Sequence, residues 1–368
     1  MGMFYYIFCI MKNLTFCITC MNRLRHLQKT LLENIKDNDL AEDIEFLILD
    51  YNSSDGLEDW VKQNFIKHIN SGLLVYYRNI TPAIYDRSHS RNMAFKLSNS
   101  EIVCNLDADN YSGNGFAFFL MENFKKNNNV FYTSDLSIRD IGGRIAMLKD
   151  DFIRVRGYNE IFSGYGFEDV DIVTRLNKNG IKQNIFYNRE FYRAIKHSHK
   201  ERVSEESLFK NWHKAYLSYI SPFKTMYVLL KKDFTVETGL LINNKEMNAN
   251  LNILEDPFSS CFDEKFQTVL TDFVEGFWKE SKENIIIVVD EKEQLFKKDG
   301  QVLTNNKYIY YELEDAYIEN IFLLLLIGAK NFKDYIDFVI SKKEVNSNGF
   351  GIGTVYKNFD YSKPIFII

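Results

Sequence analysis

Several features are scarce in this chain of 368 residues, and each scarcity argues against a class of protein. The 5 cysteines are few and odd in number, which favours free thiols in a reducing cytoplasm over a secreted disulfide framework. With 4 prolines and no tract rich in glycine and serine, a long flexible linker is not expected. No apolar run reaches the roughly eighteen residues of a membrane-spanning helix. The net charge of −5 gives no support to nucleic-acid binding, which requires clustered basic residues.

The first residues are apolar but do not form a secretion signal, because they lack a basic region and a small-residue cleavage site. Met11 precedes the first clear strand, so we interpret residues 1–13 as an N-terminal extension. The alternative is a segment that touches a membrane, with peripheral association at its inner face.

At this length the chain is too long for one ordinary core, and we expect two domains, at 14–222 and 223–368. The second contains a buried strand at 285–289 and a buried helix at 317–329, but no repeat and no motif that carries chemistry. We therefore expect it to be a smaller C-terminal α/β domain of unknown role.

Strand and helix patterns alternate through the first part of the longer domain, which predicts right-handed βαβ units and a mostly parallel, Rossmann-like sheet. The expected strands are 14–20, 44–49, 73–77 and 101–106. Helices follow the first three, with Asn22 and Ser88 as expected caps.

After residue 109 the alternation of strand and helix patterns becomes less regular, and we expect shorter elements there. The expected elements are helices at 116–124 and 168–176 and strands at 130–133, 141–145 and 185–187. Leu208, Trp212, Ala215 and Tyr219 recur at helical spacing, which predicts a helix that closes the domain.

Polar side chains follow the predicted parallel strands where ligands bind such sheets, at the carboxyl ends. These residues are Thr19, Asp50, Asp107 and Asp109. Asp107 and Asp109 can direct alternate carboxylates at one divalent ion, and carboxylate oxygen suits Mn²⁺ or Mg²⁺. The alternative is a pair of solvated aspartates at a turn.

A second acidic segment, Gly164–Asp171, begins with glycines that allow a loop to approach a ligand. Asp169 is a candidate base for a sugar hydroxyl. Asp171 fits better as an ordinary acid near a helix N-terminus. His197 and His199 point to the same side if the segment is extended, so one of them could complete a metal shell. Each could equally be a surface histidine.

The C-x-x-C pattern at Cys17 and Cys20 does not predict a redox or zinc site, because Cys17 lies inside a strand and no second pair exists. We expect both to be small core residues.

Residues 14 to about 199 resemble glycosyltransferase family 2 enzymes of the GT-A fold, a nucleotide-diphospho-sugar transferase fold. The segments that carry this resemblance are Thr19 with Asn22-Arg23, Leu49–Asp55, Ser90-Arg91-Asn92 and Asp107-Ala108-Asp109. The later part resembles the C-terminal catalytic segment of β-1,4-galactosyltransferases and chondroitin-polymerase-like enzymes. Its matching segments are Gly142-Gly143, Ala146-Met147, Arg156–Glu160 and Gly164–Asp171.

The resemblance implies roles for individual residues. For the donor, it implies that Thr19 and Asp50 contact the uridine and that Arg91 lies near the diphosphate. Arg23 and Asp107 are implied to belong to the same donor site. It implies Mn²⁺ (or Mg²⁺) between Asp107 and Asp109, with His197 or His199 completing its shell, and Asp109 as the more direct ligand.

For the acceptor, the resemblance implies Asp169 as the catalytic base, Glu168 as a contact to the acceptor hydroxyl, and Tyr165, Gly166 and Phe167 as acceptor-binding residues. Tyr165 stands where galactosyltransferases carry tryptophan, and Phe167 where they carry glycine. The identity of the sugar therefore does not follow from the resemblance.

The sequence thus predicts an inverting, metal-dependent transfer of a sugar of the Gal, GalNAc, Glc or GlcNAc class. The donor is a UDP-sugar and the acceptor an oligosaccharide or lipid-linked glycan, in bacterial surface polysaccharide synthesis. One alternative is a nucleotidyltransferase, although Met21–Leu24 is not the basic glycine-rich loop expected there. The other is a non-catalytic module that binds nucleotide-sugars, which the intact set of acidic residues argues against.

Overall fold

The computed structural model describes residues 12–135, 140–196, 198–221, 224–243 and 268–368, which form two compact units. Unit 1 contains the described residues up to Glu160 together with Glu168–Lys196 and Glu344–Ile368. Unit 2 contains Ile161–Phe167 and the described residues of 197–343. This division differs from the boundary that we expected after residue 222, because the end of the chain returns to the first unit.

Unit 1 is built on a 9-stranded sheet in the order β19-β18-β3-β2-β1-β4-β7-β6-β8. Its strands are β1 (Lys12–Cys20), β2 (Ile44–Tyr51), β3 (Leu74–Asn79), β4 (Ser100–Asn105), β6 (Val130–Thr133), β7 (Ile145–Leu148), β8 (Lys182–Ile185), β18 (Gly353–Lys357) and β19 (Pro364–Ile367). The neighbours β3, β2, β1 and β4 are parallel, whereas β7 and β18 run antiparallel to their neighbours. The predicted α/β fold with a mostly parallel central sheet is confirmed.

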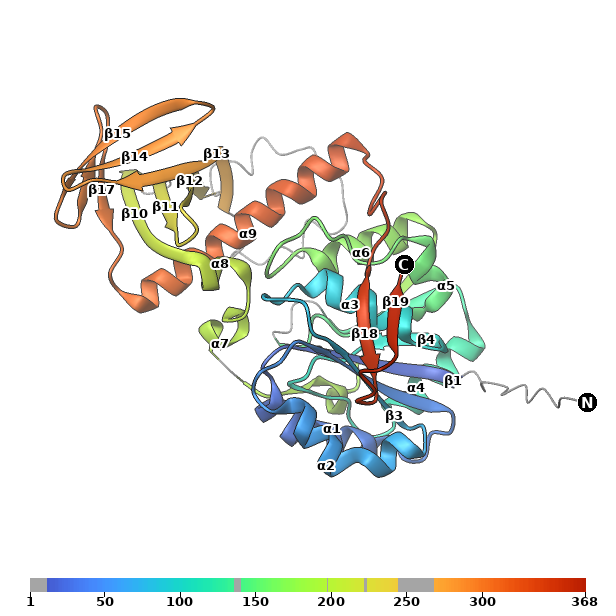
Figure 1. Cartoon of the computed structure of the whole chain (residues 1–368). Helices are drawn as coiled ribbons and strands as arrows, with labels where there is room; N and C mark the ends of the chain where they lie inside the picture. Colours follow the sequence, from blue (N-terminus) through green and yellow to red (C-terminus); the bar gives the residue numbers. More distant parts are fainter. Residues whose placement is uncertain (1–11, 136–139, 197, 222–223, 244–267) are drawn as a thin grey trace, which may run out of the picture. The chain divides into compact units, whose positions relative to one another are not determined.

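Helices cover both faces of this sheet (Figure 1). They are α1 (Leu24–Asp37), α2 (Leu57–Asn70), α3 (Arg87–Leu97), α4 (Phe116–Lys126), α5 (Lys149–Arg154) and α6 (Glu168–Lys178). The apolar sides of α1, α2 and α4 share one core with the strands, which includes Leu31, Phe65 and Phe116. On the other face Phe95 of α3 packs against Phe152 of α5, with ring centroids 4.9 Å apart.

The strand order reverses between β1 and β4, because the chain runs from β1 outward to β3 and then returns to pair β4 with the free side of β1. In open α/β sheets such a reversal leaves a crevice at the carboxyl ends of the two strands. The residues that follow β1 and β4 therefore lie at the place where this fold class binds ligands.

Two expected caps are wrong. Asn22 adopts a left-handed conformation with φ of 55°, and its side chain accepts a hydrogen bond from the backbone of Ser54. The start of α1 is instead held by Asp55, whose carboxylate accepts from the Leu24 N–H. Asp86 rather than Ser88 caps α3, by accepting from the backbone of His89.

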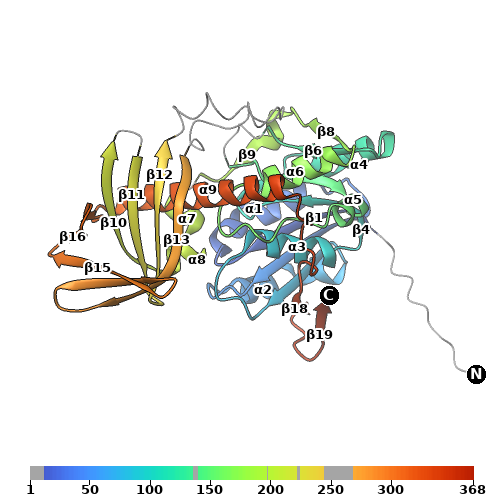
Figure 2. The same ribbon diagram turned by 90° about the horizontal axis from the view of Figure 1, so that it is seen from above.

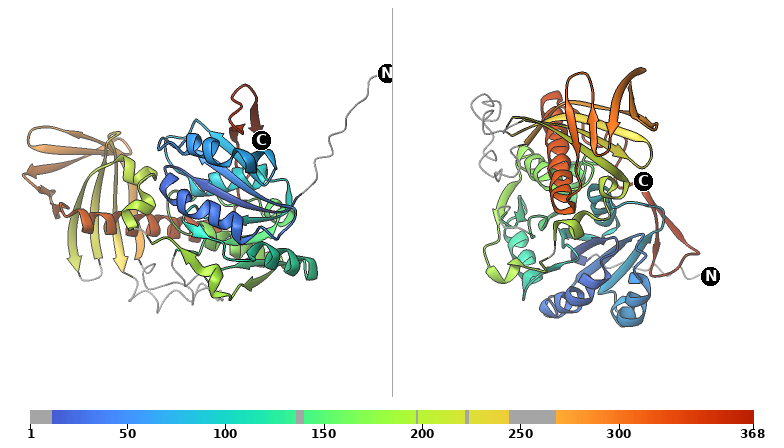
Figure 3. Two further views of the ribbon diagram at one scale, coloured as in Figure 1. Left: turned by 90° about the horizontal axis from the view of Figure 1, so that it is seen from below. Right: turned by 90° about the vertical axis from the view of Figure 1, so that its left-hand side faces the viewer.

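Unit 2 is a closed antiparallel barrel with a long helix across its strands (Figures 2 and 3). The strands are β10 (Trp212–Ser221), β11 (Lys224–Lys231), β12 (Thr235–Asn243), β13 (Thr268–Glu280), β14 (Asn284–Val289), β15 (Lys292–Asp299), β16 (Val302–Thr304) and β17 (Ile309–Glu312). The helix α9 (Ala316–Ser341) lays Phe322, Leu323 and Leu326 against residues of β10 to β13. The short helices α7 (His199–Val203) and α8 (Ser207–Asn211) precede the barrel.

The expected helix through residues 208–219 is wrong, since helix α8 ends at Asn211 and strand β10 begins at Trp212. The residues at helical spacing do not share one buried face, since Ala215 is buried whereas Tyr219 is 71% exposed. Pairing of β10 with both β11 and β17 closes the barrel, and this pairing makes the segment a strand and not a helix. In the described ranges no helix, α9 included, combines the length and hydropathy needed to cross a bilayer.

The last residues of the chain are fastened to unit 1 by polar contacts. The side chain of Asn346 donates to the carbonyl groups of Arg156 and Tyr158 and accepts from the Glu160 N–H. The Glu160 carboxylate accepts in turn from the Gly351 N–H. These bonds hold the segment that leads into β18 at the edge of the sheet.

Asn346→Ala should destabilise unit 1, because it leaves the Arg156 carbonyl and the Glu160 N–H without their partner, while the Tyr158 carbonyl keeps only the Asn92 side chain. A buried polar group without a partner costs about 1–3 kcal/mol, so the free energy of unfolding should fall by at least about 1 kcal/mol. The matched control is Asn348→Ala, at an exposed position two residues away. Equal denaturation midpoints for the two variants would contradict the role given to Asn346.

Candidate active site

The site begins at the end of β4, beside the end of β1. Asn105 is the last residue of β4 and is fully buried, and its amide nitrogen lies 2.9 Å from both the carboxylate of Asp107 and the carbonyl of Gly143. Asp107 is therefore held at the strand end with a side chain that is 31% exposed. The predicted position of Asp107 at the sheet edge matches the structure.

A buried arginine joins this strand end to the start of α6. The guanidinium of Arg91, on α3, is only 3% exposed. It lies 2.7 Å from the carboxylate of Asp169, 3.3 Å from that of Asp107 and 3.5 Å from that of Glu168. It also lies over the ring of Tyr158, 5.3 Å from the centroid. The structure thus brings Arg91, Asp107, Glu168 and Asp169 together from three separate elements.

Gly143 closes this cluster from the loop before β7. A Cβ added there would lie 2.7 Å from Nη2 of Arg91, 3.1 Å from Oδ2 of Asp107 and 3.4 Å from Oδ2 of Asp169. The first distance is shorter than a non-bonded contact allows, so a side chain at this position would push the Arg91 guanidinium out of this arrangement. At the neighbouring Gly142 an added Cβ would meet nothing within 4 Å.

The electrostatics of the cluster favour a protonatable carboxyl at Asp169. Burial raises the pKa of Asp169 to about 7; Arg91 opposes this shift, and the negative charges of Glu168 and Asp107 add to it. Glu168 is 4% exposed, and its Oε2 has no hydrogen-bond partner among the described residues. A carboxyl group with a pKa near neutral pH is well matched to accepting a proton in a reaction.

Asp109 lies just beyond, at the start of a small two-stranded sheet. Its carboxylate accepts from the side chain of Asn110, and its carbonyl accepts from the Ile195 N–H at 2.8 Å. The strands β5 (Asn110–Tyr111) and β9 (Arg193–Ala194) pair here. Arg144, fully buried, lies 3.1 Å from the Asn110 side-chain oxygen.

The predicted histidine ligands are not placed by the structure. His197 lies outside the described residues, and of His199 only the backbone, at the start of α7, is described. Among the side chains that are described, no three His, Cys, Asp or Glu residues form a group that could hold a metal ion.

The described residues nevertheless fit part of a cation site. Four carboxylates, of Asp107, Asp109, Glu168 and Asp169, accompany two buried guanidinium groups, of Arg91 and Arg144. Both hydrogen bonds to Asp107 use Oδ1, so its Oδ2 carries none from the described residues. The excess of negative charge and the free carboxylate oxygen suit a hard divalent cation, with further oxygen ligands from a bound diphosphate.

The two residues predicted to contact the uridine, Thr19 and Asp50, differ in burial and in their hydrogen-bond partners. Thr19, near the end of β1, is 7% exposed, and its hydroxyl lies 2.8 Å from that of Tyr85. Asp50 is fully buried and accepts from the Ser53 N–H and from the hydroxyl of Tyr76, at 2.7 and 2.5 Å. In this structure Asp50 therefore fixes the turn after β2. Arg23 is half-buried at the N-cap of α1, directly after β1.

The predicted acceptor residues belong to unit 2. Gly166 and Tyr165 offer carbonyl groups to the side chain of Asn331 on α9, at 2.9 and 3.4 Å. Phe167 has a left-handed backbone with φ of 73° and is 5% exposed. It packs in a small apolar cluster with Tyr335. Its side chain is thus used for packing, and it fixes the loop just before Glu168.

The structure adds residues to which the sequence had given no role in the site: Asn105, Gly143, Arg144 and Tyr158. Gly143 and Tyr158 lie in segments that carry the family resemblance, so a signal was present without a function attached to it. Cys17 and Cys20 are free and buried, which confirms that they are core residues.

The mostly parallel sheet, its strand reversal between β1 and β4 and the acidic residues beside that reversal resemble the arrangement expected of GT-A glycosyltransferases. Residues 122–200 match the model of the family described as the N-terminal domain of galactosyltransferase. This match includes Glu168 and Asp169, and it confirms the predicted similarity to galactosyltransferases. A comparison with curated proteins gives no significant match.

Three solved structures are similar to this chain. A mannosyltransferase from Pyrobaculum calidifontis in complex with GDP-Man and Mn²⁺ shows 17% identity and a TM-score of 0.41, over 48% of this chain and 55% of that one. TarS from S. aureus shows 14% identity and a TM-score of 0.42, over 52% of this chain and 61% of TarS. A Drosophila β1,4-galactosyltransferase 7 mutant in complex with manganese, UDP-Gal and xylobiose shows 10% identity and a TM-score of 0.37. The match covers 53% of this chain and 76% of that one. The chain thus covers little more than half of the mannosyltransferase.

Removing the charge of Glu168 should lower the pKa of Asp169, because that negative charge adds to the effect of burial. In Glu168→Gln the pKa of Asp169 should fall below about 7 but stay above its ordinary value, since burial remains. A ¹³C NMR titration of the aspartate carboxyls measures this, with Asp169→Asn to assign the resonance. An unshifted pKa for Asp169 in the unsubstituted protein would contradict the electrostatic description.

Proposed function

We propose that this chain is an inverting, metal-dependent glycosyltransferase that moves a sugar of the Gal, GalNAc, Glc or GlcNAc class from a UDP-sugar to a glycan hydroxyl. The observation that carries the proposal is the cluster around Arg91. It joins the Asp107 strand end, where a donor diphosphate is expected, to Asp169, a candidate base with a raised pKa.

The donor side of the proposal rests on the crevice between β1 and β4. Thr19 and Asp107 follow these strands, and Arg23 lies at the adjacent start of α1. Asp50 supports the uridine pocket through the turn that it fixes. Arg91 is the cation nearest to the Asp107 carboxylate and is proposed to lie close to the diphosphate.

Asp109 and Asp107 are the proposed ligands of Mn²⁺ (or Mg²⁺), which when bound would neutralise charge on the departing diphosphate. His197 or His199 is proposed as a third protein ligand. The Ile195 N–H bonds to the Asp109 carbonyl, so the chain that continues to His197 starts from beside the proposed site. The Mn²⁺ in two of the similar structures is consistent with this assignment.

The acceptor side requires a base and a way to place the hydroxyl. Asp169 would take the hydroxyl proton while the acceptor oxygen forms a bond to the anomeric carbon, and the bond from that carbon to UDP breaks. One displacement from the opposite face inverts the anomeric configuration. The buried Glu168, with one unpartnered oxygen, is proposed to accept a hydrogen bond from the acceptor. Tyr165 and Gly166 are the proposed acceptor contacts in the preceding loop.

The cellular role is a separate part of the proposal. The free, buried cysteines support a reducing cytoplasm, and the composition rich in Asn, Lys and Ile supports an AT-rich bacterial genome. A role in surface polysaccharide synthesis fits a lipid-linked or oligosaccharide acceptor. Screening a panel of UDP-sugars for Mn²⁺-dependent hydrolysis identifies the donor.

Asp169→Asn should lower kcat for transfer by roughly 10²–10⁴-fold, the usual contribution of a general base, with UDP affinity nearly unchanged. Since the base must be ionised, kcat/KM of the unsubstituted enzyme should rise with pH and level off above about 7. Steady-state kinetics across this pH range measure both effects. Full transfer activity in Asp169→Asn would rule out this base.

Gly143→Ala should weaken Mn²⁺-dependent UDP binding by about tenfold or more, because the new Cβ must displace the Arg91 guanidinium and crowd the Asp107 carboxylate. Gly142→Ala is the matched control, since its added Cβ meets open space. Calorimetric titration of UDP with Mn²⁺ compares the two, after thermal unfolding shows that both variants are folded. Equal affinities would place the donor elsewhere.

A further inference from the structure

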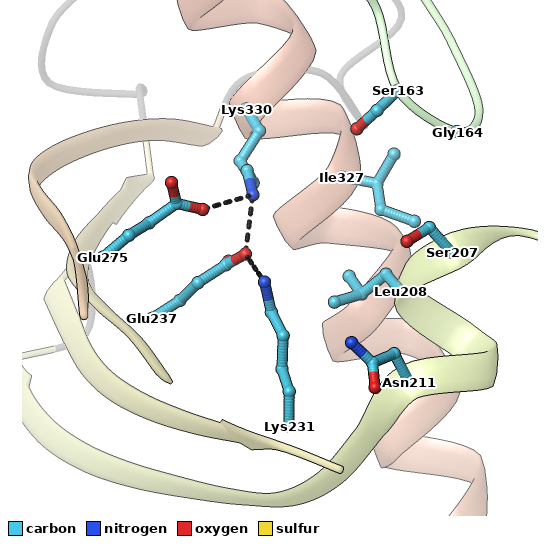
Figure 4. A pocket seen from close by; sticks show the side chains of 10 residues that line it. All are labelled: Ser163, Gly164, Ser207, Leu208, Asn211, Lys231, Glu237, Glu275, Ile327 and Lys330. Carbon is cyan, nitrogen blue, oxygen red and sulfur yellow. Dashed lines mark hydrogen bonds and ion pairs between the residues drawn. The ribbon is translucent and has the colours of Figure 1, made fainter. Parts of the chain in front are cut away.

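Unit 2 contains a pocket of about 220 Å³ that the proposed reaction does not use (Figure 4). Its lining comes from α8, α9, the barrel and the short loop that contains Ser163 and Gly164. Gly164 has a left-handed backbone with φ of 80°, and an added Cβ would lie 2.9 Å from Oε2 of Glu206. A side chain at this position would therefore strain the loop and crowd Glu206.

Charged side chains of both signs line one side of the pocket. Glu237 on β12 is ion-paired with Lys231 and, at 2.8 Å, with Lys330 on α9, which lies 3.8 Å from Glu275. Figure 4 shows these four side chains converging from the barrel and the helix. Two lysines and two glutamates leave the lining with no net formal charge.

Glu237 retains capacity for a ligand. It is 1% exposed, and its Oε2 has no hydrogen-bond partner among the described residues. Burial would raise the pKa of Glu237, but Lys330 and Lys231 outweigh that effect and hold it below its ordinary value, so the group is ionised. A buried carboxylate oxygen without a donor is costly, and a ligand hydroxyl would satisfy it.

The remaining walls provide neutral contacts. Ser163, Ser207 and Asn211 offer hydroxyl and amide groups, while Leu208 and Ile327 form an apolar surface (Figure 4). Pockets that bind small molecules commonly combine apolar walls with a few convergent polar groups.

This lining selects against charged ligands. Both lysines are already paired with carboxylates, so a phosphate or sulfate would find no unneutralised cation. A metal ion would meet two ammonium groups. A polyhydroxyl ligand without charge can donate to the carboxylates, accept from the lysines and lay an apolar face on Leu208 and Ile327.

We infer that this pocket binds an uncharged sugar unit of the acceptor glycan, other than the unit that reacts. The inference rests on the proposed function. Ser163 and Gly164 belong to the same short segment that continues through Tyr165 and Gly166 into Glu168 and Asp169. The pocket lining and the proposed base are therefore separated by only a few residues along the chain.

The test is binding of the full chain to an array of immobilised neutral and anionic saccharides, followed by titration with the best neutral one. The unsubstituted protein should bind neutral saccharides in preference to anionic ones. Ser207→Trp, which fills the pocket from an exposed position on α8, should raise Kd by about tenfold or more. Ser281→Trp, exposed in the turn between β13 and β14, is the matched control and should bind normally.

A second variant tests the charge balance without filling the pocket. Glu275→Lys leaves three lysines facing Glu237 and should shift preference toward anionic saccharides. Preference of the unsubstituted protein for anions, or unaltered binding by both Ser207→Trp and Glu275→Lys, would overturn the inference. UDP binding with Mn²⁺, measured in the same samples, should be equal in all variants. If the unsubstituted protein did not bind UDP with Mn²⁺, that result would instead refute the proposed function.

Discussion

The candidate site depends on one buried guanidinium. Arg91 is almost inaccessible to water, and a buried charge in this position must be paired. It satisfies that requirement with carboxylates from two different parts of the chain, Asp107 after β4 and Glu168 and Asp169 at the start of α6. Gly143 leaves room for the arrangement, and Tyr158 covers one face of the guanidinium. The arginine thereby fixes the distance between the proposed donor and acceptor groups and holds the base in a partly desolvated environment.

The sheet could be predicted because its strands are buried on both faces and alternate with amphipathic helices, and both patterns are visible locally. From the sheet followed the placement of Thr19 and Asp107 at one edge. The role of Arg91 as the centre of the cluster could not be predicted in this way. It depends on α3, β4 and α6 meeting in space, and a sequence without a structure does not show which carboxylates surround a given arginine.

Predictions from local sequence patterns were wrong where contacts between residues far apart in the chain determine the structure. The spacing of Leu208, Trp212, Ala215 and Tyr219 satisfies a helix, yet β10 pairs with strands on both sides to close a barrel. The return of Glu344–Ile368 to unit 1 was also missed, because its anchors to Arg156, Tyr158 and Glu160 connect residues far apart in the chain. Asn22 and Ser88 are residue types that cap helices, but Asp55 and Asp86 do so here.

The proposed function is most directly tested by locating Mn²⁺ in crystals grown with UDP, from the anomalous scattering of the metal. The account predicts one strong anomalous peak beside the carboxylates of Asp109 and Asp107, with the diphosphate of UDP on its other side and Asp169 within reach of the acceptor side. A manganese peak away from both aspartates, or UDP bound at another edge of the sheet, would contradict it.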